Sequence, residues 1–378
     1  MKILVNAISA RKGGVVTYTL NLMRSLRKLG IDATYAVPEH FPEEDGINIL
    51  RVQASDYGPF RRYLWEQTKW RNLVKSTKPD ILFSSANFAI EHCPVPQVLL
   101  VREGGLFDPL YLNTMPSRQG TLFAIERILR RRLIRRSMNI SDAVLMPSMA
   151  MRDLLAQWEP RLASKFIVNH YGTPEGLFFP TEPQRPWRED GTLRLLYVSF
   201  FYPHKCPGVI VEATRQLCAQ GIKAHVTLTT TLDELKLTAG NEVDYKIIEQ
   251  GEKDGLVTLG HVAYSKVPEL LKAHDIFVFP SISETFGHPM VEALACGVPV
   301  VAADTPINRE ICGDVALYHP PFMAEDARNV IQRLDQDPAL RKRMFSDGPR
   351  RVKELFTWDD HVKRLLNTFE ETATLARN

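Results

Sequence analysis

Short apolar runs alternate with segments of helical periodicity along most of the chain. In the first half, strand-like runs occupy 3–5, 81–85, 98–101 and 143–146, and leucines recur at helical spacing in 18–29. In the second half, strand candidates at 195–198, 224–228, 257–259, 276–279 and 298–302 are interleaved with helix candidates at 209–218, 267–273 and 289–295. Such alternation is typical of parallel sheets covered by helices.

A polar, proline-containing stretch at 179–191 separates these two regions. A segment of this kind between two periodic regions favours a domain boundary. A chain of 378 residues is also longer than most single domains, which favours two or more domains. We therefore expect an amino-terminal domain at 1–185, a second domain at 186–357, and a terminal helix at 358–378 that crosses back to the first domain.

Composition narrows the function classes only modestly. A net charge of +3 gives no reason to expect nucleic acid. Five cysteines without a C-x-x-C pair, and no secretory leader, predict reduced thiols and a cytoplasmic location, with the inner face of the plasma membrane left open. The histidines show no metal-ligand spacing, and the D-x-D at Asp335 and Asp337 is interpreted as chance, so neither a metal nor a cofactor is expected.

Two carboxylates stand in the most informative stretch of the second half. A strand ends at Pro280, a loop of small residues follows, and a helix begins near Pro289, a residue suited to a first helical turn. Glu284 in the loop and Glu292 in the helix thereby lie at the carboxyl end of a parallel strand, where ligands of open α/β sheets bind. Backbone N–H groups at 287, 288 and 290 are expected to point into the same crevice, which suits an anionic or hydroxyl-rich ligand.

This stretch resembles the E-x7-E region of the family 4 retaining glycosyltransferases of the GT-B fold. The similarity extends to 259–262, 270–275, 303–306 and Glu310. The resemblance implies an α/β chain of GT-B type, with two Rossmann-like domains whose parallel sheets face each other across a cleft. It also implies that Glu284 contacts hydroxyls of a donor sugar and Glu292 the ribose diol, while the backbone near Val262 meets the base.

A lysine follows the first strand of the second domain. Lys205 stands beside the next helix start, where an ammonium can neutralise a diphosphate. Similar transferases carry an arginine shortly before this lysine, whereas this chain has Phe200, which puts the usual arginine–diphosphate contact in doubt. The alternative interpretation is that Lys205 is a surface lysine.

The first half supplies weaker candidates. Gly13 and Gly14 stand at a strand-to-helix turn, where the backbone can approach a phosphate closely. The turn does not match the G-x-G-x-x-G fingerprint, and an ordinary tight turn is the alternative.

Many family members have a histidine where this chain has Arg102. Arg102 cannot act as a general base, but it can hold an anion, and Glu103 is a candidate for contacting the acceptor. A structural Arg–Glu pair remains the alternative.

A basic segment at 122–136 has helical periodicity, with Leu122, Ile125, Leu129 and Leu133 along one side. Six arginines, from Arg127 to Arg136, oppose a single glutamate. Such a helix can bind anionic lipid headgroups or meet a polyphosphate-linked acceptor. It can equally be a packing helix with a solvated basic face, and the sequence leaves these possibilities open.

The resemblance implies a retaining, metal-independent hexosyltransferase of polysaccharide biosynthesis. It would act on a nucleoside diphosphate sugar, UDP before GDP, and on a glycan or lipid-linked acceptor. A sugar-nucleotide epimerase and an inactive GT-B scaffold subunit are the alternatives. The catalytic candidates are Glu284, Lys205, Arg102 and Glu103. The donor-binding candidates are Gly13, Gly14, Ser199, Lys205, Val262, Glu284, Thr285, Phe286, Gly287, His288 and Glu292.

Overall fold

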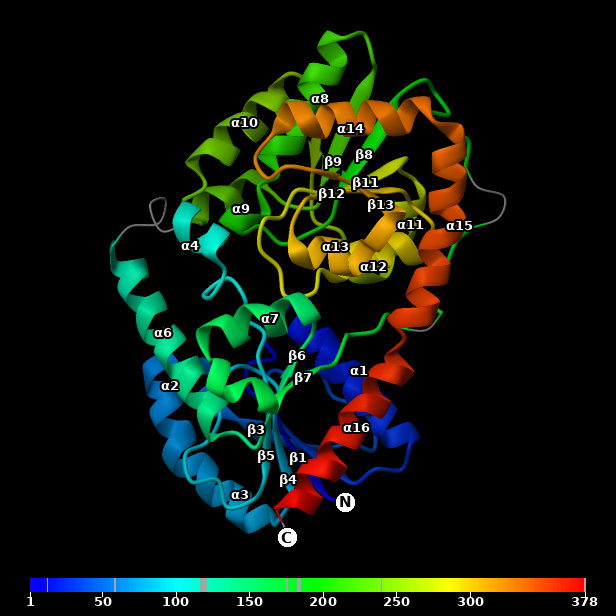
Figure 1. Cartoon of the computed structure of the whole chain (residues 1–378). Helices are drawn as coiled ribbons and strands as arrows, with labels where there is room; N and C mark the ends of the chain where they lie inside the picture. Colours follow the sequence, from blue (N-terminus) through cyan, green and yellow to red (C-terminus); the bar gives the residue numbers. More distant parts are fainter. Residues whose placement is uncertain are drawn as a thin grey trace. The chain divides into compact units, whose positions relative to one another are not determined.

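The computed structural model describes residues 1–11, 13–57, 59–115, 121–174, 176–181, 185–238 and 240–376. The chain forms two compact units. Unit 1 comprises Met1–Gly104, Glu126–His170 and Trp358–Asn378, and unit 2 comprises Gly105–Ile125 and Tyr171–Thr357. Each unit is built on one parallel sheet, which confirms the expected α/β class with two parallel-sheet domains (Figure 1).

The sheet of unit 1 has the strand order β3-β2-β1-β4-β5-β6-β7. Its strands are β1 (Ile3–Asn6), β2 (Ala33–Pro38), β3 (Asn48–Val52), β4 (Ile81–Ser84), β5 (Gln97–Leu100), β6 (Ala143–Met146) and β7 (Phe166–Val168). The central strands are buried throughout. Continuous apolar runs are what a parallel sheet requires, because helices cover both of its faces.

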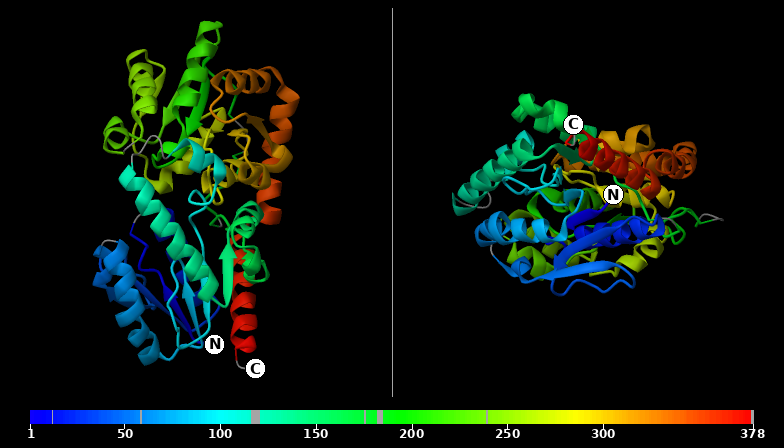
Figure 2. Two further views of the ribbon diagram at one scale, coloured as in Figure 1. Left: turned by 60° about the vertical axis from the view of Figure 1, so that its left-hand side comes forward. Right: turned by 90° about the horizontal axis from the view of Figure 1, so that it is seen from below.

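Helices on both faces enclose this sheet. They are α1 (Gly14–Lys28), α2 (Pro59–Trp65), α3 (Arg71–Thr77), α6 (Thr121–Ile140), α7 (Met149–Trp158) and α16 (Trp358–Leu375). The two views agree that α1 and α16 lie on one side of the sheet and that α2 and α3 lie on the other (Figures 1 and 2).

The carboxyl-terminal helix α16 is part of unit 1. The Trp358 indole donates a hydrogen bond to Ser25 Oγ at 2.6 Å, and His361 Nε2 lies 3.1 Å from the Tyr18 hydroxyl. Farther along the helix, the ring of Phe369 packs 5.2 Å from that of Phe83 in β4. The last helix of the sequence thus completes the core built by the first residues.

The sheet of unit 2 has the order β10-β9-β8-β11-β12-β13. Its strands are β8 (Leu193–Tyr197), β9 (Ala224–Leu228), β10 (Val257–Leu259), β11 (Ile276–Phe279), β12 (Val300–Ala303) and β13 (Ala316–His319). Its helices are α4 (Pro109–Thr114), α8 (Gly208–Ala219), α9 (Leu232–Leu237), α10 (Glu242–Lys253), α11 (Val267–Lys272), α12 (His288–Ala295), α13 (Pro306–Cys312), α14 (Ala324–Gln336) and α15 (Pro338–Leu355). Helix α8 packs with α10 and α14, whereas α12 packs with α13 and α15.

In each sheet, successive strands are added first on one side of the first strand and then on the other side. In unit 2 the chain runs outward from β8 to β9 and β10, and then returns to the other side of β8 with β11. Ligands of doubly wound sheets bind outside the carboxyl ends of the strands at such a switch point. The loops that follow β8 and β11 are therefore the natural place to look for a site.

The two units divide the chain differently from the expected ranges in two segments. Gly105–Ile125, which includes α4, packs with unit 2 although it lies within 1–185. Met115 of this segment is fully buried in a small cluster with Cys206 and Ile282. The stretch from Tyr171 onward also belongs to unit 2, so the change of unit precedes residue 185.

Candidate functional site

Lys205 and Glu284 meet at the switch point of the second sheet. Lys205 ends a 3-10 turn, Pro203–Lys205, in the loop after β8, and Glu284 lies in the loop after β11. The Lys205 ammonium forms an ion pair with Glu284 Oε1, and each side chain is only 11% exposed. The alternative of a surface lysine is therefore wrong.

The electrostatics of this pair favour an ionised carboxylate. Burial alone raises the pKa of Glu284, but the charge of Lys205 and the bond that it donates outweigh that effect, so the pKa is lowered. The Lys205 ammonium also lies 5.3 Å from the centre of the Phe279 ring. The loops thus hold one positive and one negative group in a largely water-free setting.

Glu292 lies in α12 in a different environment. Its side chain is buried, and its Oε1 accepts a hydrogen bond of 2.7 Å from the Tyr264 hydroxyl. Burial raises the pKa of Glu292 to about 7, with the Tyr264 bond opposing this shift only in part. The two glutamates therefore differ in charge at neutral pH, one fully ionised and the other near its midpoint.

The turn that starts α12 depends on a glycine. Gly287 precedes the helix with φ 85°. A Cβ at this position would lie 2.5 Å from the Met290 Cε atom. The expectation that the Met290 N–H faces a ligand is wrong, because it donates to the Gly287 carbonyl at 3.0 Å.

Aromatic packing fixes the loop that carries Glu284. The Phe286 ring is buried and contacts Phe356 edge-on at 5.5 Å. His288 stacks on Tyr171 with ring centres 5.0 Å apart. The side chains of Phe286 and His288 thus pack within unit 2, and the expectation that their backbone faces a donor stays a prediction. Thr285, between Glu284 and Phe286, is half-buried.

The remaining donor candidates of unit 2 lie on neighbouring loops. The Ser199 N–H donates to Thr229 Oγ1 at 3.1 Å, and its hydroxyl donates to the Phe200 carbonyl at 2.9 Å. Val262 is half-buried in the loop after β10. Sequence reasoning missed Tyr264, two positions farther on, because nothing local marks its bond to Glu292.

In unit 1, the glycine turn lies at the carboxyl end of β1. Gly13 has φ 67° and is the residue before the first turn of α1. Gly14 begins the helix, and a Cβ at this position would meet nothing within 4 Å. Arg11 is exposed, and Lys12 lies outside the described residues. The turn leaves room for a ligand to approach the backbone.

Arg102 and Glu103 follow β5 and have separate partners. The Arg102 N–H donates to Asn87 Oδ1 at 2.7 Å, and its guanidinium lies 4.1 Å from the centre of the Tyr18 ring. Glu103 pairs with Arg130 of α6 and accepts a bond of 3.1 Å from Asn87. The structural partner of Glu103 is therefore Arg130 rather than Arg102.

Helix α6 exposes much of the apolar side that its periodicity indicates. Ile125 is 64% exposed and Leu129 is also exposed, whereas Ile134 and Met138 are buried. The predicted apolar face is thus largely solvent-facing, and the side chain of Leu122 lies outside the described residues. The core-facing stripe is displaced around the helix axis.

Several arginines of α6 are engaged within unit 1. Arg135 pairs with Glu159 and Arg136 with Glu91, in addition to the Arg130–Glu103 pair. The guanidinium of Arg131 lies 4.6 Å from the centre of the Trp158 ring. These contacts use much of the positive charge of the helix.

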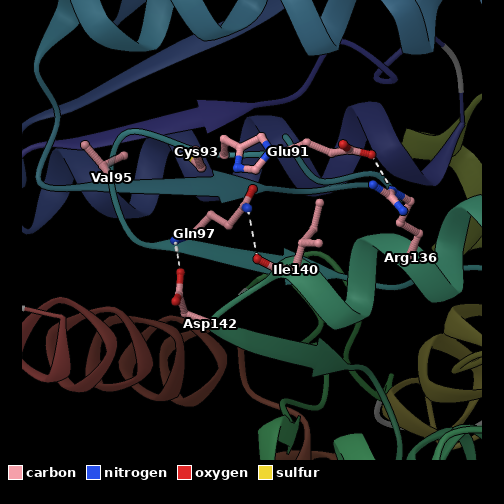
Figure 3. Close-up of a pocket in the computed structure, with 8 residues that line it drawn as sticks. Glu91, Cys93, Val95, Gln97, Arg136, Ile140 and Asp142 are labelled. Atoms are coloured by element: carbon pink, nitrogen blue, oxygen red, sulfur yellow. Dashed lines mark hydrogen bonds and ion pairs between the residues drawn. The ribbon is translucent and has the colours of Figure 1, made fainter.

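A cavity of about 340 Å³ lies where β5 and β6 begin, and its lining contains none of the predicted catalytic or donor-binding residues (Figure 3). Its polar groups bond to one another: Arg136 pairs with Glu91, and the Gln97 N–H donates to Asp142 Oδ2 at 2.8 Å. Burial raises the pKa of Cys93 to about 11, which keeps this thiol unreactive. The cavity lining is Glu91, His92, Cys93, Val95, Gln97, Arg136, Ile140 and Asp142.

Two further expectations concern metals and membranes. Asp335 accepts hydrogen bonds from Trp187 and Arg188, so this aspartate has a structural role. Within the described ranges, no group of three or more histidine, cysteine or acidic side chains could hold a metal ion. Over the same ranges, none of the helices combines the length and apolar character needed to span a bilayer.

Comparison with known proteins places both halves in glycosyltransferase families. Residues 12–168 match the family described as Glycosyltransferase Family 4, and residues 179–351 match Glycosyl transferases group 1. Mannosylfructose-phosphate synthase of Agrobacterium fabrum is 24% identical, covering 96% of this chain and 87% of the relative. O-antigen chain mannosyltransferase B of Escherichia coli is 31% identical, but this match spans only 34% of each chain.

Solved structures show the same fold over the whole chain. Sucrose-phosphate synthase from Thermosynechococcus elongatus superposes with a TM-score of 0.76 at 18% identity and covers 100% of both chains. Anabaena HepE, in complex with UDP-glucose, gives a TM-score of 0.73 at 19% identity over 98% of this chain and 100% of that one. Since the two family matches together span most of the sequence, the chain is a glycosyltransferase of the GT-B fold, with a family 4 domain followed by a group 1 domain.

Proposed function

We propose that this chain transfers a hexose from a nucleoside diphosphate sugar to a hydroxyl of a glycan or lipid-linked acceptor in polysaccharide biosynthesis, with retention of configuration and without a metal. The observation that carries this proposal is the buried Lys205–Glu284 pair at the switch point of the second sheet, with Glu292 in the helix that follows. An ammonium beside two carboxylates suits a ligand that is both anionic and rich in hydroxyls.

UDP is the favoured nucleotide and GDP the second choice. Crystal structures of the fold relative HepE contain UDP and UDP-glucose. Curated relatives include the mannosyltransferases O-antigen chain mannosyltransferase B and RfbU, which supports a hexose as the transferred group. Ser199, Val262 and Thr285 are the further donor contacts that we propose in unit 2. Gly13 and Gly14 of unit 1 are candidates for backbone contact with a phosphate.

Lys205, Glu284 and Glu292 have different roles in the proposed reaction. Lys205 stabilises the leaving diphosphate, where negative charge develops as the bond from the anomeric carbon to the phosphate oxygen breaks. The acceptor oxygen bonds to the anomeric carbon on the same face, and its proton passes to a phosphate oxygen of the leaving group. Glu284, held ionised by Lys205, accepts hydrogen bonds from the sugar hydroxyls, and Glu292 accepts from the ribose diol.

Two charged residues of unit 1 contribute acceptor contacts in this proposal. Arg102, fixed by Asn87 and Tyr18, binds an anionic group of the acceptor, and Glu103, oriented by Arg130, accepts hydrogen bonds from the acceptor's hydroxyls.

Exposed Ile128 and Leu129 beside exposed Arg132 on α6 support peripheral contact with anionic lipid at the inner face of the plasma membrane. Co-sedimentation with anionic vesicles, reduced in Ile128→Ser, tests that contact.

A thermal-shift screen against UDP, GDP, ADP, dTDP and their sugars, in the presence of EDTA, tests the donor assignment. A nucleotide that binds the folded chain raises its melting temperature. We expect a shift with UDP or GDP that Glu292→Ala abolishes and that the exposed control Glu325→Ala on α14 retains. No shift with any nucleotide, or a shift that requires added metal, would contradict the proposal. NMR of the anomeric proton of the product then reports retention or inversion.

A further inference from the structure

Two aromatic side chains project from the loop that carries Lys205. Phe200 is 55% exposed and Tyr202 is 49% exposed, whereas Phe201 between them is buried in the core of unit 2. The backbone at Tyr202 is extended, with φ −141° and ψ 151°. Side chains two positions apart in an extended segment point the same way, and the exposed–buried–exposed order of residues 200–202 fits that pattern. Phe200 and Tyr202 therefore form one surface, which we name the aromatic ledge.

His204 supports the Tyr202 ring of the aromatic ledge. The Tyr202 ring stacks on His204 with centres 5.7 Å apart and planes inclined by 12°. His204 in turn contacts the ring of Tyr111 at 5.7 Å, and its carbonyl accepts the Ile282 N–H at 3.0 Å. Burial, and then the charge of Lys205, lower the pKa of His204 to about 4, so this supporting ring is neutral at physiological pH. A ring already fixed on one face loses little freedom when a ligand covers the other.

The ledge belongs to the loop after β8, which also carries Lys205 of the donor pair. Lys205 directly follows His204, and Glu284 lies two positions after Ile282. Other exposed apolar side chains of unit 2 include the aliphatic Leu237 and Val243 and the aromatic Phe179, but none of these shares a loop with Lys205. Isolated apolar residues on a surface are ordinary, but two aromatic rings beside a charged pair at a switch point are typical of a binding site.

We propose that the aromatic ledge binds a neutral sugar ring of the acceptor, by stacking of the ring's C–H face on Phe200 and Tyr202. This inference rests on the proposed transferase function and deepens it. Aromatic faces carry partial negative charge and attract the partly positive edges of their partners. Residues 198–207 contain one lysine or arginine, Lys205, and that residue is paired with Glu284. The loop thus suits a neutral glycan unit better than a sugar phosphate.

Saturation-transfer NMR on the full chain tests the assignment, with α-1,3-mannobiose, maltotriose and chitotriose as neutral probes and glucose 6-phosphate as the charged probe. Each probe is measured in the presence of the nucleotide that stabilises the wild type. We expect at least one neutral probe to receive saturation on its C–H face. The double variant Phe200→Ala/Tyr202→Ala should bind it about tenfold more weakly. The single variant Tyr202→Phe should bind normally, and Leu237→Ala serves as the exposed apolar control.

Nucleotide binding, measured by calorimetry in the same samples, separates this inference from the function on which it rests. A wild type that binds no nucleotide overturns the proposed function itself. With nucleotide binding intact, the ledge assignment is overturned if no neutral probe binds, if glucose 6-phosphate alone binds, or if the double variant binds the neutral probe as well as the wild type. A double variant that folds but loses the nucleotide instead places the ledge in the donor site and also overturns the assignment.

Discussion

At the scale of single residues, the Lys205–Glu284 pair carries both stability and proposed chemistry. Glu284→Gln keeps the shape of the side chain but leaves the ammonium without its anionic partner. We expect a loss of about 1–3 kcal/mol in the free energy of unfolding, because a buried charge without its partner is costly. Transfer activity should fall about 100-fold, a size typical for the loss of one electrostatic contact to the transition state.

Urea unfolding and initial-rate kinetics measure these two effects. The control is Glu269→Gln, since the Lys266–Glu269 pair is exposed, with side chains 62% and 71% accessible. Exposed pairs of this kind contribute about 0–1 kcal/mol. Equal effects in the two variants would show that the Lys205–Glu284 pair has no special role.

Glu292 gives the chain a pH dependence of predictable sign. Its pKa of about 7 in the folded protein exceeds the ordinary glutamate value of 4.5, so the folded state binds more protons than the unfolded state between these two pH values. The free energy of unfolding should therefore fall as pH rises from about 4.5 to 7, by up to about 3 kcal/mol relative to Glu292→Gln. Urea titrations of both proteins at pH 5 and pH 8 check this difference.

Ionisation of Glu292, which lowers the free energy of unfolding, should raise the affinity for the nucleotide. If Glu292 accepts hydrogen bonds from the ribose diol, nucleotide binding should tighten as the carboxyl group ionises between pH 6 and pH 8. Calorimetry across this range should show the trend in the wild type and a flat profile in Glu292→Gln. A trend that survives in the variant would assign it to another group.

At the scale of elements, the start of α12 determines where Glu292 and the loop backbone lie. Gly287→Ala places a Cβ against Met290 at a residue with positive φ. We expect a loss of about 1–3 kcal/mol in stability and loss of nucleotide binding. Gly221 is a matched control, because its φ is 82° and a Cβ there meets nothing within 4 Å.

Gly221→Ala should cost only the backbone strain, about 1–2 kcal/mol, and should keep nucleotide binding. Thermal melts and calorimetry on both variants separate strain from steric displacement. Full nucleotide affinity in Gly287→Ala would mean that the start of α12 does not form part of the donor site.

At the scale of the whole molecule, the terminal helix α16 completes unit 1. Phe369 is fully buried against Phe83, so Phe369→Ala should cost about 3–5 kcal/mol. Hydrogen exchange followed by mass spectrometry should show faster exchange in β4 and α16, with Glu370→Ala on the exposed face of the helix as control. Nucleotide binding by unit 2 should persist at low temperature, and its loss would contradict this division of roles.

Local elements were largely predictable because their signals are local. The strand expected at 143–146 coincides with β6, and the helix expected at 209–218 lies within α8 (Gly208–Ala219). The edge strand β3 gave no comparable signal, since it is partly exposed and lacks a continuous apolar run. In α6 the sequence left open whether the apolar side meets the core, because an apolar periodicity does not say which of two apolar faces is buried.

The sequence by itself determined the α/β class, the two-domain plan and the stretch around Glu284 and Glu292, since periodicity, turn residues and motif spacing are properties of neighbouring positions. Only the tertiary structure decided which distant groups meet. Lys205 and Glu284 pair across 79 positions, and Tyr264 reaches Glu292 across 28. Likewise, Gly105–Ile125 packs with unit 2 and α16 with unit 1. Such pairings depend on the order of the strands and on which helices cover each face of the sheets. Both of these features are determined by the packing of the whole core.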